Sequence, residues 1–522
     1  MKVALFTDNY LESGKVLEPF RVELLKEFCR RCSAVILIQS NDYMDGQGSF
    51  KTRNDETHVL SALKSFRPDF VFSLNRSGLN REILLQLECP IASWYIDNPN
   101  RFEKNLRQFK TGEKVFCATK YQLDWMKAFS AAEGISVDTA YLPFCTSERQ
   151  FYPDDSIPSS DMCDVSFVGT LWDPTLLSRM FNDLIQTDEQ KAVVLNLFES
   201  YAEKYDEGLP TYLRSRLPNE GMAVDQWRTL VDDFISSSRR IQILRQLADL
   251  DLRIYGTRTW SGFSLFASTE LFKRFSVTPI VSPKALANLY RHSRTAISIA
   301  NHQAQTGFPI RIFDILATGT PLITDRHSEL GELFEEGKMF LSYSSPREAR
   351  EQVDQVLNNQ KVAERMRTAA LAEVRSKHTF ANRVSTVLGG LPAAACPENI
   401  TFVSEQLAED FLIHDSEFRN ASFKRLSVGT FKEISRLPKS VQKPAKLAGR
   451  LARAANMWLL ALYLPIKYIR TRSDRTQRGS IIEDLKFLWG DLRLVFQAQS
   501  RILKIHVNRY RYLLSKSQDT GT

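Results

Sequence analysis

The chain has 522 residues, which is too long for one hydrophobic core, so two or three domains are expected. Apolar residues make up 43% of the chain and charged residues 25%, as in ordinary soluble globular proteins. The sequence contains no run of 18 apolar residues, which excludes a membrane-spanning helix. The short apolar start at Val3 favours a first strand over a signal peptide, and the seven scattered cysteines suit a reducing cytoplasm.

Residues 1–150 alternate short apolar runs with helical patterns, which predicts parallel strands joined by crossover helices. The predicted strands are Val3–Phe6, Ala34–Ile38, Phe70–Leu74, Ile91–Ile96 and Val115–Ala118. Helical patterns lie between them, for example at Leu17–Arg30, His58–Phe66 and Tyr121–Phe129. Ligands of such sheets bind at the carboxyl ends of the strands. Asp97 follows one of these strands directly, so its side chain is expected in that crevice.

A second αβ series starts at Val165, within a predicted domain of residues 151–390. A mostly helical stretch, about 174–250, interrupts the series and reads as an insertion, with the alternative that part of it forms helices of the domain itself. The series resumes with strands at Leu252–Gly256, Ala296–Ile299 and Leu322–Thr324, and with helices at 283–292, 346–358 and 361–376. Cys29 and Cys32 fall in a helical pattern with no second pair nearby, which favours core thiols over a metal or redox site.

Residues 391–522 are predicted to be a helical extension that becomes basic from about residue 436. Residues 441–516 carry 16 Lys and Arg against 4 Asp and Glu, whereas the rest of the chain carries 53 against 57. An apolar run at Met457–Ile466 has basic flanks and is too short to span a bilayer. Two interpretations stay open: an interfacial helix on an anionic membrane, or a helix packed on the body. No recognition motif supports nucleic-acid binding.

Residues 310–325 predict a helix, a Gly-Thr-Pro turn and a short buried strand that ends in Asp325. Arg311 and Asp314 are three residues apart, so they share one face near the start of the helix. A cation for a diphosphate and a carboxylate for ribose hydroxyls would suit this place. An ordinary αβ unit, with the two side chains solvated or paired with each other, fits the spacing as well.

The same segment resembles the "R-x-F-E-x-L-A-x-G-x-P-L-I" signature of the C-terminal domain of GT-B glycosyltransferases, and more narrowly of the CgeB-like (spore-maturation-type) group. Four further segments resemble elements of these enzymes in the right order: Trp94–Pro99, Tyr141–Phe144 with Phe151–Pro153, Asp164–Thr170, and His378–Phe380 with Arg383. The resemblance covers roughly residues 1–390. It implies an α/β fold with two Rossmann-like domains facing a cleft, the first on the acceptor side and the second on the donor side.

The resemblance implies transfer of a sugar from a nucleotide-diphosphate-sugar donor to a glycan, lipid-linked or protein acceptor. Loops at the strand ends of the second domain would then contact the donor, and glycine permits close approach to phosphate. The candidate donor-binding residues are Gly169, Thr170, Gly256, Arg258, Asn301, His302, Arg311, Asp314, Gly319 and Thr320. Asp97 is the candidate acceptor-side base, with a turn cap before Pro99 as its alternative.

One departure from the wider family concerns two glutamates that many retaining enzymes carry eight positions apart. Here Asp314 matches the later one and Thr306 the earlier one, so the stereochemistry stays open. Asp249-Leu250-Asp251 has the spelling of a metal-binding Asp-x-Asp, but it precedes a strand and reads as a helix end. No metal or other cofactor is therefore expected. The alternative class is a non-catalytic GT-B-like scaffold that its basic tail recruits to an anionic membrane or a partner.

Overall fold

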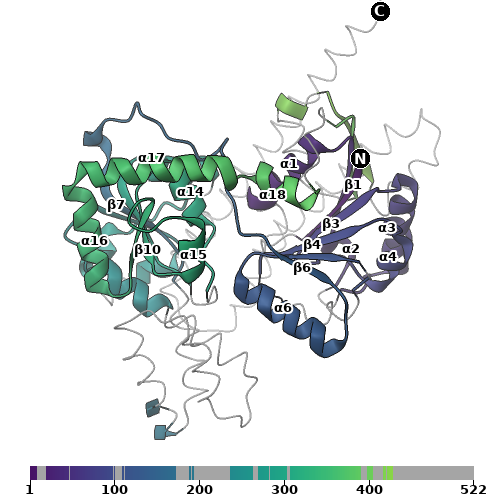
Figure 1. The fold of residues 1–522 in the computed structure, drawn as a ribbon, viewed down its shortest axis with the longest axis horizontal. Coiled ribbons are helices and arrows are strands. Elements are labelled where there is room, and N and C mark those ends of the chain that lie inside the picture. Colours follow the sequence, from purple (N-terminus) through teal and green to yellow (C-terminus); the bar gives the residue numbers. More distant parts are fainter. Residues whose placement is uncertain are drawn as a thin grey trace, which may run out of the picture. The chain divides into compact units, whose positions relative to one another are not determined.

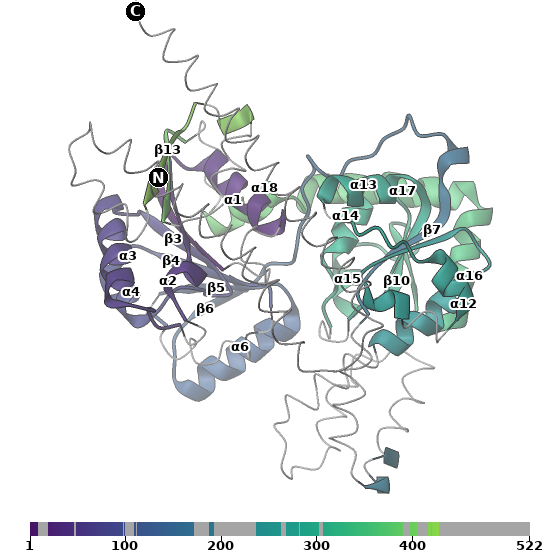
Figure 2. The ribbon, with the colours of Figure 1, turned by 180° about the vertical axis from the view of Figure 1, so that it is seen from behind.

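The structure is a computed structural model of the full chain. It describes residues 1–8, 19–45, 48–97, 99, 109–110, 112–171, 187–189, 191–192, 236–262, 268–280, 282–301, 306–389, 397–403, 416–418 and 420–426. Two parallel sheets organise residues 1–427 (Figures 1 and 2). The basic region 441–516 and most of the predicted insertion at 174–250 lie outside the described residues.

The first sheet has eight strands in the order β13-β12-β2-β1-β3-β4-β5-β6, and every neighbouring pair is parallel. Its strands are β1 (Lys2–Thr7), β2 (Ala34–Gln39), β3 (Phe70–Leu74), β4 (Ile91–Tyr95), β5 (Lys114–Cys117), β6 (Asp138–Tyr141), β12 (Asn399–Val403) and β13 (Ser422–Leu426). Its helices are α1 (Pro19–Arg31), α2 (Ser40–Tyr43), α3 (Arg53–Phe66), α4 (Arg81–Gln86) and α6 (Lys120–Glu133). The five strands and three helices predicted before residue 150 are confirmed.

The second sheet has five parallel strands in the order β11-β10-β9-β7-β8. Its strands are β7 (Cys163–Val168), β8 (Leu252–Tyr255), β9 (Ser293–Ser298), β10 (Leu322–Asp325) and β11 (Phe340–Tyr343). The helices after residue 268 are α12 (Thr269–Arg274), α13 (Pro283–Arg291), α14 (Arg311–Ala317), α15 (Ser328–Leu333), α16 (Pro346–Asn358) and α17 (Gln360–Lys377). Residues 236–245 form a further helix. The predicted α/β class with two Rossmann-like sheets is confirmed.

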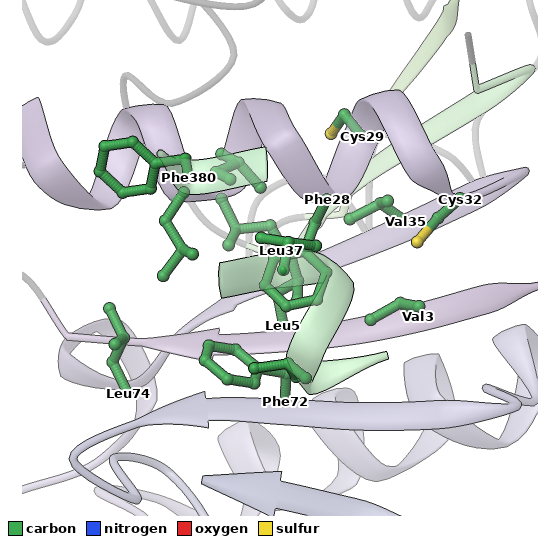
Figure 3. Close-up of a cluster of buried hydrophobic side chains, with 14 of the residues drawn as sticks. Val3, Leu5, Phe28, Cys29, Cys32, Val35, Leu37, Phe72, Leu74 and Phe380 are labelled. Atoms are coloured by element: carbon green, nitrogen blue, oxygen red, sulfur yellow. The ribbon is translucent and has the colours of Figure 1, made fainter. Parts of the chain in front are cut away.

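Helix α18 (Phe380–Val387) returns the chain to the first sheet. Phe380 and Val384 pack in the same core as Leu5, Phe28 and Leu37, and Figure 3 shows the Phe380 ring on that cluster. A capping box at Thr379 begins the helix, because the Thr379 side chain accepts from the Asn382 amide while the Asn382 side chain accepts from the Thr379 amide. The segment that resembled a closing helix therefore crosses back to the first sheet.

Strands β12 and β13 correct the prediction that residues 391–522 form a helical extension. Both strands extend the first sheet beyond β2, and Ile400 and Phe402 are buried in its core. Asn-Ile-Thr-Phe-Val alternates polar and apolar residues over only five positions, a signal too short to stand out beside longer helical patterns. The boundary predicted at residue 391 therefore does not end the first sheet's body.

Cys29 and Cys32 are both buried in the core of the first sheet, as Figure 3 shows, and both are free thiols. Burial raises the pKa of the Cys32 thiol to about 12, so this thiol stays protonated. Among the described residues, no three His, Cys, Asp or Glu side chains form a group that could hold a metal ion. The core-thiol interpretation of this pair fits its environment.

Candidate functional site

The strand order of the second sheet has a switch point between β7 and β9, because the chain runs to opposite sides of the sheet from there. Gly169 and Thr170 follow β7, and Asn301 follows β9 after a short loop. In open α/β sheets, the crevice at such a point receives the ligand. Three predicted donor-site residues therefore lie where a ligand of this sheet is expected.

Gly169 and Gly256 meet at the carboxyl ends of β7 and β8. The Gly169 amide donates to the carbonyl of Tyr255 at 2.9 Å. A Cβ built on Gly256 would lie 2.0 Å from the Gly169 carbonyl oxygen, which no side chain permits. A Cβ on Gly169 would lie 2.4 Å from the Phe167 ring. Both positions require glycine because other protein atoms approach them this closely. The predicted contact of these loops with phosphate stays a prediction.

Arg311 comes to the same loop from the start of α14. Its guanidinium donates to the carbonyl of Val168, the last residue of β7, and it is half-buried. Its terminal nitrogen would lie 3.3 Å from a Cβ on Gly169. The predicted diphosphate cation therefore stands beside the predicted glycine loop.

Asp314, three residues later, lies in a buried site against the segment that joins the two sheets. Its Oδ1 accepts a hydrogen bond of 2.6 Å from the Thr146 hydroxyl. Burial raises the pKa of this carboxyl to about 7, although Thr146 and the Arg311 charge both act to lower it. Arg311 and Asp314 thus bond to different partners, and the ribose role of Asp314 stays a prediction.

The remaining predicted donor residues divide between two ends of the second sheet. Arg258 is exposed after β8, and Asn301 accepts from the Ser236 hydroxyl at 3.2 Å. His302 lies outside the described residues. Gly319 and Thr320 precede β10, so they lie at its amino end and away from the glycine loop.

Gly319 and Thr320 line a groove of about 780 Å³ at that amino end. Gly319 ends α14 with a φ of 75°, and the Thr320 hydroxyl donates to the Tyr290 carbonyl at 2.7 Å. These contacts end helix α14 and stabilise the turn that follows it. The structure therefore separates these two residues from the other candidates, because a Gly-Thr-Pro turn between a helix and a parallel strand falls at the strand's amino end.

Asp97 follows β4 of the first sheet and is half-buried. Its Oδ2 accepts from the Asn75 side-chain amide at 2.8 Å, and its backbone amide donates to the Asn75 Oδ1 at 3.1 Å. Asn75 itself is fully buried at the end of β3, with a φ of 51°. The carboxylate of Asp97 is therefore held by a neighbouring strand end, in addition to any cap on its own turn.

Two arginines at the start of the 236–245 helix were not predicted, and they brace the carboxyl end of the second sheet. Arg239 forms a buried ion pair with Asp325, with nitrogen–oxygen distances of 2.6 and 3.0 Å. Asp325 also accepts from the Ala300 amide at 2.7 Å. Arg240 donates to the carbonyl of Thr170. The arginine dipeptide falls in a stretch that read only as helical, so no local signal marked it.

Glu329 is a third residue that the sequence analysis missed. It lies at the start of α15, is 2% exposed, and accepts from the Lys120 backbone amide at 2.9 Å and from the Thr306 hydroxyl. Burial raises the pKa of its carboxyl. Asp249, which was predicted to lie at a helix end, lies in the turn between the 236–245 helix and β8, and it pairs with Arg350 at 2.5 Å.

Residues 239–389 match the protein-family model described as "Glycosyl transferase-like". This part of the chain is similar to glycosyl transferase-like domains. The match includes Arg239, Gly256, Arg311 and Asp325, four of the residues that form or brace the carboxyl end of the second sheet. No curated protein sequence matches the chain.

Three solved structures are similar to the chain at low identity. Sucrose-phosphate synthase (tll1590) from Thermosynechococcus elongatus is 11% identical, with 75% of this chain and 98% of that chain covered and a TM-score of 0.45. A glycosyltransferase from Rickettsia africae ESF-5 is 11% identical, with 79% and 99% covered and a TM-score of 0.46. Anabaena Alr3699/HepE in complex with UDP and glucose is 11% identical, with 75% and 100% covered and a TM-score of 0.45.

None of the helices in the described part of the chain is long and apolar enough to cross a membrane.

Proposed function

We propose that the chain is a GT-B glycosyltransferase that uses a nucleotide-diphosphate sugar, and that its narrower relatives are the CgeB-like enzymes. The observation that carries the proposal is the glycosyl transferase-like match over residues 239–389, together with the glycine contact and Arg311 at the carboxyl end of the same sheet. The five motifs in register support the narrower group.

In this reaction, an oxygen of the acceptor hydroxyl attacks the anomeric carbon of the donor sugar. A glycosidic bond forms, and the bond between the anomeric carbon and the diphosphate oxygen breaks, so that the nucleoside diphosphate leaves with the electron pair. Arg311 and the amides of the Gly169 loop would stabilise the charge that builds on the diphosphate. If the enzyme inverts configuration, Asp97 would take the acceptor proton. We infer that this arrangement needs no metal ion, since arginine and backbone amides supply the electrophilic groups.

A thermal-shift screen against nucleotide sugars tests the donor. A ligand that binds only the native state at 100 times its Kd adds about 2.7 kcal/mol to the free energy of unfolding. Binding followed by slow hydrolysis would favour the enzyme over a non-catalytic scaffold. If no nucleotide sugar stabilises the protein, the proposed function is wrong.

Arg311→Ala tests the placement of the diphosphate. Loss of a charge-assisted hydrogen bond costs about 1.5–3 kcal/mol, or roughly one to two decades in donor affinity. Arg347→Ala is the control, because Arg347 forms only an exposed pair with Glu351 on α16. Unchanged donor affinity in a folded Arg311→Ala variant would remove Arg311 from the site.

Asp97→Asn tests the base. Since a base acts in the transition state, this change should spare donor binding and lower turnover. Asp314→Ala should instead raise the Kd of the donor, because ribose contacts form in the ground state. Full activity of Asp97→Asn on the true acceptor would refute the base assignment.

We also propose a cytoplasmic protein that the basic region 441–516 brings to the inner face of a membrane; this region lies outside the described residues. Each basic residue near an anionic surface contributes about 1 kcal/mol, which salt screens. The full chain should therefore sediment with anionic vesicles and be released as salt rises, whereas a chain ending near residue 435 should not bind them. A full chain that ignores vesicles at low salt, with a truncated chain that aggregates, would favour the packed helix.

A further inference from the structure

The loop that leaves β7 has an unusual hydrogen-bond pattern, because side chains satisfy four of its carbonyls in succession. The donors come from three segments of the second sheet's body: the start of α14, the 236–245 helix, and residues 257–260 after β8. The bonds run from Arg311 to Val168, from the Trp260 indole to Gly169, from Arg240 to Thr170, and from the Thr257 and Thr259 hydroxyls to Leu171. The loop is therefore fixed through its carbonyl groups.

Trp260 makes the bond nearest the switch point. Its Nε1 donates to the Gly169 carbonyl at 2.6 Å, and the side chain is 0% exposed. The indole lies edge-on to Phe167, with ring centroids 5.9 Å apart, and parallel to Phe275, with centroids 6.4 Å apart. A Cβ on Gly256 would lie 2.6 Å from Nε1. The packing thus fixes the direction of the indole N–H, and the glycine at 256 leaves room for it.

The carbonyl and the amide of one peptide unit lie in a plane and point in opposite directions. Because Trp260 turns the Gly169 carbonyl into the protein, the Thr170 amide of the same peptide unit must point the other way. Arg240 likewise holds the Thr170 carbonyl, so the Leu171 amide of that peptide unit also points away from the protein. Neither amide has an acceptor within the part of the chain that the structure describes. Successive amides of this kind form an anion-binding concavity.

We propose that Trp260 is a positioning residue, which aims the Thr170 amide at the diphosphate of the donor. The proposal rests on the proposed function and names the group that receives the leaving diphosphate. Trp260 would not touch the ligand. Its indole N–H acts through the Gly169–Thr170 peptide.

The test compares Trp260→Phe with Trp94→Phe by calorimetric titration of UDP, GDP and ADP and of the matching nucleosides. Trp94 is the matched control, because it is also 0% exposed and donates its Nε1 to one backbone carbonyl, that of Leu142, at 2.9 Å. A phenyl ring keeps most of the packing in both variants and removes one hydrogen bond. Thermal unfolding of both variants measures the general cost.

Trp260→Phe should weaken binding of the preferred nucleoside diphosphate by about threefold to tenfold, the range of one net hydrogen bond. Binding of the matching nucleoside should not change, and Trp94→Phe should match the wild type with both ligands. Arg240→Met removes the side chain that holds the Thr170 carbonyl, so it should also weaken binding of the diphosphate and spare the nucleoside. This variant replaces Trp260→Phe in the test if Trp260→Phe does not fold.

Three results would overturn the proposal. First, folded Trp260→Phe could bind the diphosphate as tightly as the wild type, which would show that the peptide does not contact the ligand. If Trp260→Phe does not fold, the same result in Arg240→Met would show this. An equal loss in Trp94→Phe would show a general effect of destabilisation. If the wild type binds none of the three diphosphates, the proposed function falls and this inference with it, whereas the first two results leave the proposed function standing.

Discussion

Each of the two sheets contains a buried pair of arginine and carboxylate, but the two pairs hold different segments. In the first sheet, Arg76 after β3 bonds to Glu113 before β5 at 2.7 and 3.1 Å, and both side chains are fully buried. In the second, Arg239 bonds to Asp325, which also holds the Ala300 amide after β9. The first pair braces the body of a sheet, whereas the second braces the loops at its carboxyl end. Similar chemistry thus has a structural role in one sheet and supports a candidate site in the other.

The largest effect is expected from removing the carboxylate of each pair. Glu113→Ala and Asp325→Ala should each lower the free energy of unfolding by about 3–5 kcal/mol, because each leaves a buried guanidinium without its partner. Denaturant unfolding measures both. Only Asp325→Ala should also weaken nucleotide-sugar binding, since it frees the β9 loop. If the two variants, measured where both are folded, bind the donor equally well, the Arg239–Asp325 pair does not support the candidate site.

Asp314 provides a pH-dependent test of the segment between the sheets. Its folded-state pKa of about 7 lies above the usual value near 3.8, so the folded state holds the proton more tightly than the unfolded state does. The contribution to stability is therefore complete below about pH 4 and is lost as the pH rises to about 7, with a slope near 1.4 kcal/mol per unit within that window.

Asp314→Asn should remove this slope, and the difference between the two unfolding curves isolates it. The subtraction is needed because burial lowers the pKa of His327 to about 4, and that of His378 to about 3. Both histidines stabilise the fold more as the pH rises from there to about 6.5, which opposes the Asp314 effect. If the difference curve is flat from pH 4 to 7, the carboxyl is not protonated in the folded protein.

Gly256→Ala should act on the second sheet alone. The added Cβ would overlap the Gly169 carbonyl oxygen, and overpacking of this kind costs about 1–3 kcal/mol. Donor affinity should fall with it, since the Gly169 loop must move. Gly262→Ala is the control, because nothing lies within 4 Å of its added Cβ. A folded Gly256→Ala variant with wild-type donor affinity would separate this contact from the site.

The sequence predicted the features that depend on neighbouring residues. The helix at Arg311, the turn at Gly319 and the strand that ends at Asp325 come from spacing within 16 residues, and all three are confirmed. Glycine after a strand similarly marked Gly169 and Gly256 as close-approach positions, although their contact with each other needed the structure.

The contacts between distant segments were beyond such patterns. Thr146 and Asp314 are 168 residues apart, and Arg239 and Asp325 are 86 apart. Periodicity indicates which face of an element is buried, but not which polar group from a distant segment contacts that face. The Gly319–Thr320 turn precedes its strand, whereas the glycine loop follows one, so in a parallel sheet the two lie at opposite ends. These long-range pairs decide how the candidate site is held.

The smallest effect on donor binding is expected at Asn75, which tests whether the first sheet has a site of its own. Its φ of 51° is also found at Arg67, the residue that ends α3. Glycine tolerates this conformation, so Arg67→Gly should stabilise the protein by up to about 1 kcal/mol and leave turnover unchanged. Asn75→Gly gains less relief, because asparagine tolerates this conformation. It also loses the hydrogen bonds to Asp97 and to the Ile96 amide, so the free energy of unfolding should fall by about 1–3 kcal/mol. Turnover, followed as release of nucleoside diphosphate from the nucleotide sugar, should fall about tenfold at constant donor affinity, because a base must be oriented to act. Turnover equal to that of Arg67→Gly would mean that Asn75 only shapes a turn, and that the first sheet contributes no positioned base.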